Sequence, residues 1–364
     1  MSEEIARARA LLSVGRGEQA QEELSRLLAR APESVDALCL LARCHEAADR
    51  YGPMLAATEQ AVAAAPGNEW PHRLRSIALR KLQWVDESVQ EARRALHLAP
   101  HLWQTHVNLV ESLLADGSVP ALRDAYRSVR QARLIAPEEP EVHIAAGRFY
   151  HAISDPAAAR RCYQRTLALD PHNGTARNNL AVVELRQGRP TRAGERLQDV
   201  LAERPTDALY QRNAKATALS WTHRLLEFGT LAWLAELVIA QVSGRLWPVR
   251  LGAAVLIAGG YLGVAWLRYR RLAPALRRMV RENRYAVPLG AVQVVTVPAI
   301  ALAWGSESVL ARFLLTPLLI VSFAAGAGSL IQFRNRIVVR AVRVVRRWRY
   351  RWTVVRPVER PQET

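Results

Sequence analysis

The sequence predicts an all-α protein, with about six stacked helical hairpins followed by four membrane-spanning helices and a basic tail. Two observations lead to this prediction. Proline recurs at spacings of 34 residues, with one spacing of 37, at Pro32, Pro66, Pro100, Pro137, Pro171 and Pro205. Long apolar runs then fill much of residues 206–364. A period near 34 residues is typical of helical hairpins that bury their apolar faces against their neighbours.

The proline register aligns other positions of the repeat. One position, mostly small, should let the two helices of a hairpin approach closely (Ala20, Met54, Ser88, Ala125, Ala159 and Ala193). Another suits a tight turn with a left-handed backbone between the helices (Gly15, Asp49, Gly117 and Gly188). The fourth unit departs from the register because three extra residues fall near Gly117–Pro120. Residues 1–205 are therefore expected to form one solenoid.

These units resemble the tetratricopeptide repeat family. The matching residues are Leu180, Ala181, Gly188, Ala193, Leu197 and Pro205 in the last unit, and Gly147, Tyr150, Ala159, Tyr163 and Pro171 in the fifth. The third unit departs from the family pattern, because Arg75 and Ser76 replace the usual Leu–Gly pair. The resemblance implies a tetratricopeptide-like solenoid whose concave surface holds a peptide or a partner protein, whereas most of the matched residues only build the stack.

By this resemblance, the partner-binding groove is formed by the first helix of each unit. The candidate groove residues are Trp70, Arg73, Arg80, Asn108, Glu111, Arg148, His151, Asn178 and Arg186. Some family members clamp a carboxylate with a set of basic and asparagine residues at fixed positions. This sequence does not contain the complete set. Binding of a chaperone tail is therefore not supported.

Composition changes after Pro205. Residues 1–205 hold 27 basic and 26 acidic residues, whereas residues 206–364 hold 23 and 7. Thr206 and Asp207 can cap a connecting helix over 206–227, which is predicted to run into the first span. Four apolar runs follow, each near the roughly 20 residues that a membrane-spanning helix needs. They predict transmembrane helices over about 228–243, 246–267, 285–304 and 309–331, although a buried core of a soluble domain is an alternative.

Arginine placement predicts the orientation of these spans. The 268–284 loop and the basic tail, 332–364, carry 17 arginines, whereas the connectors between the other spans carry two. Basic segments face the cytoplasm, so the solenoid and both termini are expected there. The chain does not open with a cleavable signal peptide. Because 48 of the 50 basic residues are arginine, a GC-rich bacterial genome and hence the bacterial inner membrane are expected.

Two sets of charged residues are singled out in the second half. Arginines at helical spacing in the tail (Arg336, Arg340, Arg343, Arg347 and Arg351) are expected to face anionic lipid, beside a face with Val338, Val342, Val345 and Trp352. Solvated arginines that only stop translocation are the alternative. Glu236 lies inside the first span, and Arg250 or Arg312 could pair with it.

No enzyme, cofactor or metal site is predicted. Cys39, Cys44 and His45 do not have the spacing of a structural zinc site, and the third cysteine, Cys162, is far away. The histidines show no pairing with a nucleophile. Nucleic-acid binding through the tail is a weaker interpretation, because lipid is the nearer anionic partner. The predicted function is a membrane-anchored scaffold that recruits a cytoplasmic protein or peptide, and the alternative is a regulatory or structural part of a transport or export system.

Overall fold

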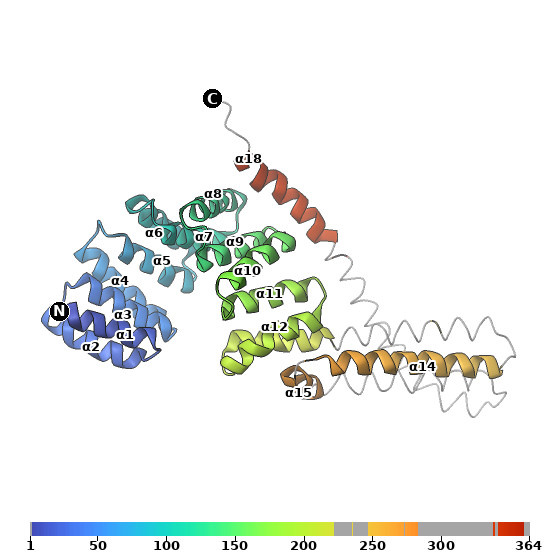
Figure 1. The fold of residues 1–364 in the computed structure, drawn as a ribbon. Helices are drawn as coiled ribbons and strands as arrows, with labels where there is room; N and C mark the ends of the chain where they lie inside the picture. Colours follow the sequence, from blue (N-terminus) through green and yellow to red (C-terminus); the bar gives the residue numbers. More distant parts are fainter. Residues whose placement is uncertain are drawn as a thin grey trace. The chain divides into compact units, whose positions relative to one another are not determined.

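The structure is a computed structural model that describes residues 2–221, 235, 247–272, 274–282, 338 and 341–359. Every regular element in these residues is a helix, which confirms the all-α prediction (Figure 1). The chain divides into two compact units. The first comprises Met1–Pro171 with Arg346–Thr364, and the second comprises His172–Val345. The predicted domain boundary after Pro205 stays a prediction.

Helical hairpins build the repeats, as the proline period predicts. In the first unit the helices are α1 (Ser2–Ser13), α2 (Gly17–Arg30), α3 (Val35–Ala47), α4 (Tyr51–Ala64), α5 (Glu69–Lys81), α6 (Val85–Leu98), α7 (Trp103–Asp116), α8 (Val119–Ile135), α9 (Pro140–Ala152) and α10 (Pro156–Leu169). The second unit contains one further hairpin, α11 (Gly174–Arg186) and α12 (Pro190–Glu203). The side chains of all six residues at the small position, Ala20 through Ala193, are fully buried.

The turn inside each hairpin contains one residue with a left-handed backbone. Gly15, Gly117 and Gly188 have φ angles of 78°, 69° and 74°. Asp49, which the register also places in a turn, has a φ of 55°. The same turn position is occupied by Gln83 and Ser154 in the remaining hairpins, with φ angles of 67° and 62°. A search of the sequence for residues that suit this turn misses Gln83 and Ser154, because the fold imposes the left-handed turn even on residues that disfavour it.

A second recurring contact joins consecutive hairpins. After four of the six prolines, the side chain six residues further along bonds to the carbonyl oxygen of that proline. His72, His106 and His143 do so through Nε2, at 3.1, 2.9 and 2.8 Å. In the second unit, Gln211 donates to the Pro205 oxygen at 2.6 Å. These histidines, which carry no catalytic pattern in the sequence, therefore satisfy backbone groups that the turn leaves unpaired.

The third repeat, which departs from the family pattern, has a buried polar network. Ser88 donates to the Ser76 carbonyl oxygen at 2.9 Å, and its hydroxyl lies 2.8 Å from that of Ser112. Asn108 donates to the Ser76 hydroxyl at 2.6 Å. Ser76, Ser88 and Ser112 are fully buried. The network links α5, α6 and α7, because buried polar groups must find partners.

In the second unit, two elements beyond the repeats pack around α12. Residues 208–221 form a helix. Asp207 caps its N-terminus, because its Oδ1 accepts from the backbone NH groups of Leu209 and Tyr210 at 2.9 and 3.2 Å. The other is α15 (Pro274–Glu282), which follows α14 (Trp247–Arg270). The side chain of Leu276 in α15 is fully buried and fits against Gly194 of α12, where an added Cβ would lie 2.9 Å from Leu276 Cδ1.

The predicted membrane spans find no support in the described residues. The second span, 246–267, coincides with α14. In the parts of the chain that the structure describes, no helix is both long and apolar enough to cross a membrane. Outside the described residues lie nearly all of the other three predicted spans, as well as Glu236, Arg312 and the side chain of Arg250.

Candidate functional site

The first helices of the hairpins form a layer of their own in the first unit. Each of α1, α3, α5 and α7 contacts the first helix of the next hairpin, whereas no comparable contact joins consecutive second helices in the described residues. The first helices therefore lie on the inner side of the curved stack. On α5, α7 and α9 they present half-buried side chains at the same repeat positions, which we call the inner stripe: Trp70, Arg73, Ile77, Arg80, Gln104, Val107, Glu111, Leu114, Arg148 and His151.

Ion pairs organise part of the inner stripe. Arg148 of α9 reaches Glu111 of α7 at 2.8 Å, so this pair connects two hairpins, while 42% of the Arg148 side chain stays exposed. Arg73 pairs with Glu69 one helical turn earlier, at 3.1 Å. These contacts fix the direction of the arginines and leave their exposed edges available to a partner.

Two other atoms of the inner stripe are buried without a hydrogen bond. Arg80 Nε and Gln104 Oε1 find no partner among the described residues. The first is a donor and the second an acceptor, on adjacent first helices. A buried polar group without a partner costs free energy, so such groups call for an explanation. Five buried atoms outside the stripe, among them His45 Nδ1 and Arg75 Nε, also lack a partner among the described residues, so this feature does not mark the stripe as a binding site.

The structure places six of the predicted groove residues on the inner stripe: Trp70, Arg73, Arg80, Glu111, Arg148 and His151. Asn108 lies one residue past the stripe position of Val107, which turns it into the core, where it bonds to Ser76. Asn178 is buried and accepts a hydrogen bond from Asn213 of the helix 208–221, at 2.8 Å. Arg186 is exposed in the second unit, and its carbonyl oxygen accepts from Arg343.

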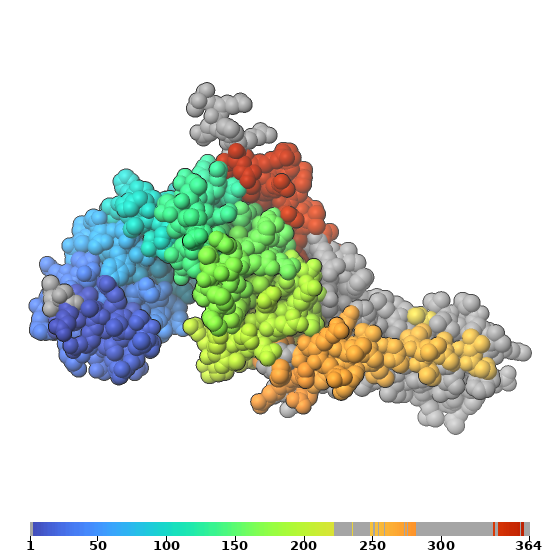
Figure 2. Space-filling view, viewed as in Figure 1, coloured from blue at the N-terminus to red at the C-terminus, as the bar shows by residue number. Residues whose placement is uncertain are grey.

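The C-terminal residues pack on the repeats of the first unit. We call residues 346–359 the docked segment; it comprises the end of a helix over 341–350, the π-helical turn η1 (Arg351–Val355) and α18 (Arg356–Glu359). Val354 is fully buried in the core cluster that contains Tyr126 and Phe149, and Tyr350 and Val358 pack against that cluster. The docked segment lies against the fourth and fifth hairpins (Figure 2, red on green).

Polar side chains of α8 hold the docked segment. Arg123 Nε donates to the Thr353 carbonyl oxygen, and Arg130 donates to the Val358 oxygen at 3.1 Å. The Tyr126 hydroxyl donates to Glu359 at 2.7 Å. Burial, together with the Glu359 carboxylate, raises the pKa of Tyr126 well above its ordinary value. Since π-helical turns interrupt the regular hydrogen-bond ladder, the Arg123 contact falls where the segment's backbone is irregular.

The three extra residues of the fourth repeat lengthen the helix that holds the docked segment. The second helix of each other hairpin has 14 residues and begins three residues before the small position, whereas α8 has 17 and begins six residues before Ala125. The extension therefore comprises residues 119–121, and the three side chains that contact the docked segment, Arg123, Tyr126 and Arg130, follow it. Sequence reasoning found the insertion but not this contact; the side chains spaced 123, 126 and 130 along one helical face were the available signal.

The arginines predicted to face lipid have different environments. Arg347 pairs with Asp155 at 3.2 Å, and Arg343 donates to the Arg186 carbonyl oxygen. Both are thus engaged with the repeats. Arg351 is exposed, and Arg336 and Arg340 lie outside the described residues. Docking on α8 orients the segment, so helical spacing alone does not decide which arginines remain free for another partner.

The cysteines do not form a metal or nucleophilic site. Cys39, Cys44 and Cys162 are buried. Burial raises the pKa of Cys39 to about 12 and that of Cys162 to about 11, so both are thiols at neutral pH. Over the described residues, no group of three or more His, Cys, Asp or Glu side chains could hold a metal ion.

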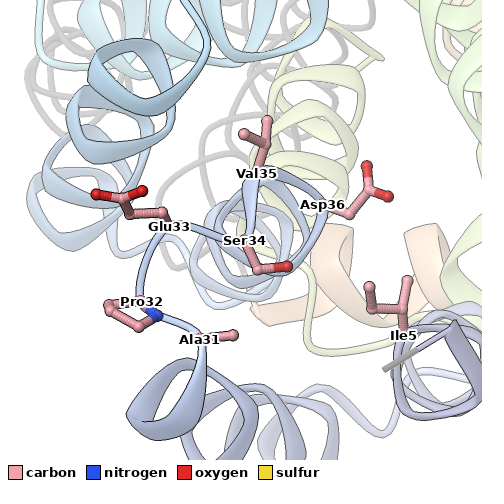
Figure 3. Close-up of a pocket in the computed structure, with 7 residues that line it drawn as sticks. All are labelled: Ile5, Ala31, Pro32, Glu33, Ser34, Val35 and Asp36. Atoms are coloured by element: carbon pink, nitrogen blue, oxygen red, sulfur yellow. The ribbon is translucent and has the colours of Figure 1, made fainter.

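A hollow of about 640 Å³ lies at the N-terminal end of the stack, between α1 and the turn before α3. Figure 3 shows Ile5 on one side and the turn from Ala31 to Val35 on the other. Pro32, Glu33 and Asp36 are exposed, and the two carboxylates point in different directions. Such an open, divergent arrangement does not form a ligand site.

Comparisons with known proteins agree with the repeat architecture. The sequence model of the tetratricopeptide repeat family matches residues 5–69 and 144–208. A search of curated proteins finds no match. Among solved structures, TTC0263, a thermophilic TPR protein in Thermus thermophilus, has 21% identity and a TM-score of 0.48 over 50% of this chain and 98% of that one.

Two further structures show the same kind of similarity. The APC/C hetero-tetramer Cut9–Hcn1 has 15% identity and a TM-score of 0.50, and the match covers 58% of this chain but only 41% of that one. PilW, a widely conserved type IV pilus biogenesis factor, has 14% identity and a TM-score of 0.47, with 58% of this chain and 96% of PilW covered. At these identities the similarity concerns the fold alone. The stacked hairpins are thus similar to those of tetratricopeptide proteins, and the family model recognises repeats of this type in residues 5–69 and 144–208.

Proposed function

We propose that this chain is a scaffold that binds a protein or peptide on the inner stripe of its solenoid. The observation that carries the proposal is the inner stripe itself, a row of half-buried side chains at matching repeat positions on α5, α7 and α9. Trp70 is half-buried in it, and 42% of the Arg148 side chain stays exposed although it pairs with Glu111. Aromatic and arginine side chains are the types that dominate binding energy at protein interfaces.

Photo-crosslinking in cells tests this proposal. A photoreactive residue at Val107, on the inner stripe, should form an adduct with a partner, whereas one at Arg94, exposed on the second helix α6, should not. The change Arg80→Glu should reduce the yield of the Val107 adduct at least tenfold, because it reverses the charge of a half-buried side chain of the inner stripe. Equal adducts at both positions, or an adduct insensitive to Arg80→Glu, would contradict the proposal.

The second part of the proposal is that the C-terminal half attaches the scaffold to the bacterial inner membrane and meets anionic lipid through its basic loop and tail. The four apolar runs and the arginine-rich flanks of the sequence support it, together with the exposure of Val255, Leu256 and Trp266 on α14. Recruitment of the bound partner to the membrane would then be the protein's task.

Membrane attachment is tested on the full chain in its host cell. The protein should stay in the membrane fraction after an alkaline carbonate wash, which strips peripheral proteins. Of two engineered cysteines, one replacing Ser306 should react with an impermeant thiol reagent in intact cells, whereas one replacing Ser329 should not. Recovery of the chain in the wash would rule out integral attachment, and the reverse labelling pattern would rule out the predicted orientation.

A further inference from the structure

The docked segment has two faces with different partners. Tyr350, Val354 and Val358 pack on the core of the first unit. Trp348 and Trp352, four residues apart, are 65% and 43% exposed, and their ring centroids lie 5.9 Å from each other. Residues four apart lie on the same helical face. The tryptophan face therefore points away from α8 and is available to a second partner.

The chemistry around the two tryptophans combines positive charge with apolar surface. Arg346, Arg349 and Arg351 are exposed beside them. The guanidinium of Arg356 lies 3.6 Å from the centre of the Trp352 ring. Immediately before the segment, Val344 and Val345 are 68% and 63% exposed. The helix over 341–350 contains no acidic residue.

We infer that the docked segment connects the solenoid to an anionic membrane surface, with one face seated on α8 and the opposite face in the lipid headgroup region. This inference rests on the proposed membrane attachment. Tryptophan rings prefer the membrane interface, and arginines are attracted by anionic headgroups. The exposed valines favour lipid over a nucleic acid, because a nucleic acid offers aliphatic side chains no comparable apolar partner.

Because the docked segment is held on α8, its contact with lipid would also position the repeats, which a free tail could not do. Arg123, Tyr126 and Arg130 fix the segment at three points along α8. Lipid binding by the opposite face would therefore hold the fourth hairpin at the membrane surface. The segment thus determines which part of the solenoid lies at the bilayer.

The test uses the full chain in lipid bilayer discs. Because the native cysteines are buried, a polarity-sensitive fluorophore can be attached at Val345→Cys. Its emission should be at least twofold brighter in discs with phosphatidylglycerol than in discs of phosphatidylcholine alone. The matched control is Leu134→Cys on α8, also an exposed site at 73%, where the emission should not change. The triple variant R346Q/R349Q/R351Q should lose the increase.

A second variant separates lipid contact from seating on α8. Val354→Asp places a carboxylate in the buried contact and should release the segment from α8, while the Val345→Cys signal stays bright. Distances from a label at Leu134→Cys to the disc surface should then change from a narrow to a broad distribution. A distribution that stays narrow in Val354→Asp overturns the connecting role.

Other outcomes would each contradict a particular part of the inference. Equal brightness in both kinds of disc overturns the anionic-lipid contact, and the same brightening by double-stranded DNA in detergent indicates a nucleic-acid partner instead. If the chain does not enter discs at all, the membrane attachment fails. In that case, vesicles of phosphatidylglycerol added to the free chain still test the segment, and only their failure to brighten the probe removes the lipid contact as well.

Discussion

The helix α15 packs on α12 through apolar side chains, whereas the docked segment is held on α8 by hydrogen bonds to its own backbone as well as by Val354. In the first case Leu276 fits against Gly194 of α12, and Leu276 and Val280 also form a cluster with Ala218 and Trp221 of the helix 208–221. In the second, Arg123 and Arg130 donate to carbonyl oxygens of the segment. Apolar burial depends on contact area and is not directional, whereas hydrogen bonds to the backbone depend on precise geometry.

The difference bears on how permanent each contact is. A fully buried leucine contributes several times the net free energy of a typical hydrogen bond. We therefore expect α15 to be a fixed part of the second unit. The docked segment, with one fully buried side chain, is expected to open more readily. A segment that opens locally is also the one that can respond to a partner.

The largest expected effect comes from a change in the apolar contact between α15 and α12. Leu276→Ala should cost about 2–5 kcal/mol of local stability, because it leaves a cavity against Gly194. Hydrogen exchange should accelerate in α12 and in the helix 208–221. The matched control on the same helix is Arg281→Ala, an exposed position, which should leave exchange unchanged. Equal effects of the two changes would mean that α15 does not depend on this seat.

Removal of one hydrogen bond between α8 and the docked segment should have a smaller effect on stability. Tyr126→Phe removes the hydroxyl that bonds to Glu359 and keeps the ring in the core, so it should cost about 1 kcal/mol. Exchange in residues 350–359 should become about fivefold faster, since that free energy corresponds to such a factor. Exchange in α12 should not change. If exchange in the segment is unaffected, the bond between Tyr126 and Glu359 does not contribute to holding it.

The turns of the repeats offer a smaller, stabilising change away from either seat. Gln83 has a φ of 67°, in the region that glycine tolerates best. Gln83→Gly should raise the free energy of unfolding by about 0.5–1 kcal/mol, because relief of strain exceeds the added entropy of the unfolded chain. The converse change, Gly188→Gln, should lower it by a similar amount. Thermal melting of the full chain measures both, and the same sign for both would refute the turn argument.

The smallest effect is one of pH. Burial lowers the pKa of His143 below its ordinary value. The unfolded chain then binds more protons than the folded one, so stability should fall as the pH drops through about 6.5. His143→Gln should reduce that slope while it keeps the bond to Pro137, as Gln211 does with Pro205. His101→Gln, at an exposed site, is the control; an unchanged slope in His143→Gln would exclude this histidine as the cause.

The family resemblance predicted that the candidate groove residues lie on the first helix of each repeat. Trp70, Arg80 and Glu111 have equivalent half-buried places on the inner stripe of α5 and α7, whereas their role in binding stays a prediction. The resemblance also named Asn108, which lies one residue after Val107, and one residue along a helix turns a side chain by about 100°. Only the structure shows that Asn108 serves the buried network around Ser76.

The sequence by itself determined the repeat. The 34-residue period, the small position between helices and the left-handed turn each follow from local backbone and packing requirements, and the period recurs through the repeats, so a single chain carries several copies of the signal. The tertiary structure decided where α15 and the docked segment pack. Their contacts join residues far apart in the sequence, such as Gly194 with Leu276 and Tyr126 with Glu359. Contacts of this kind leave no period in the sequence, and the carbonyl oxygens that accept from Arg123 and Arg130 are common to every residue type.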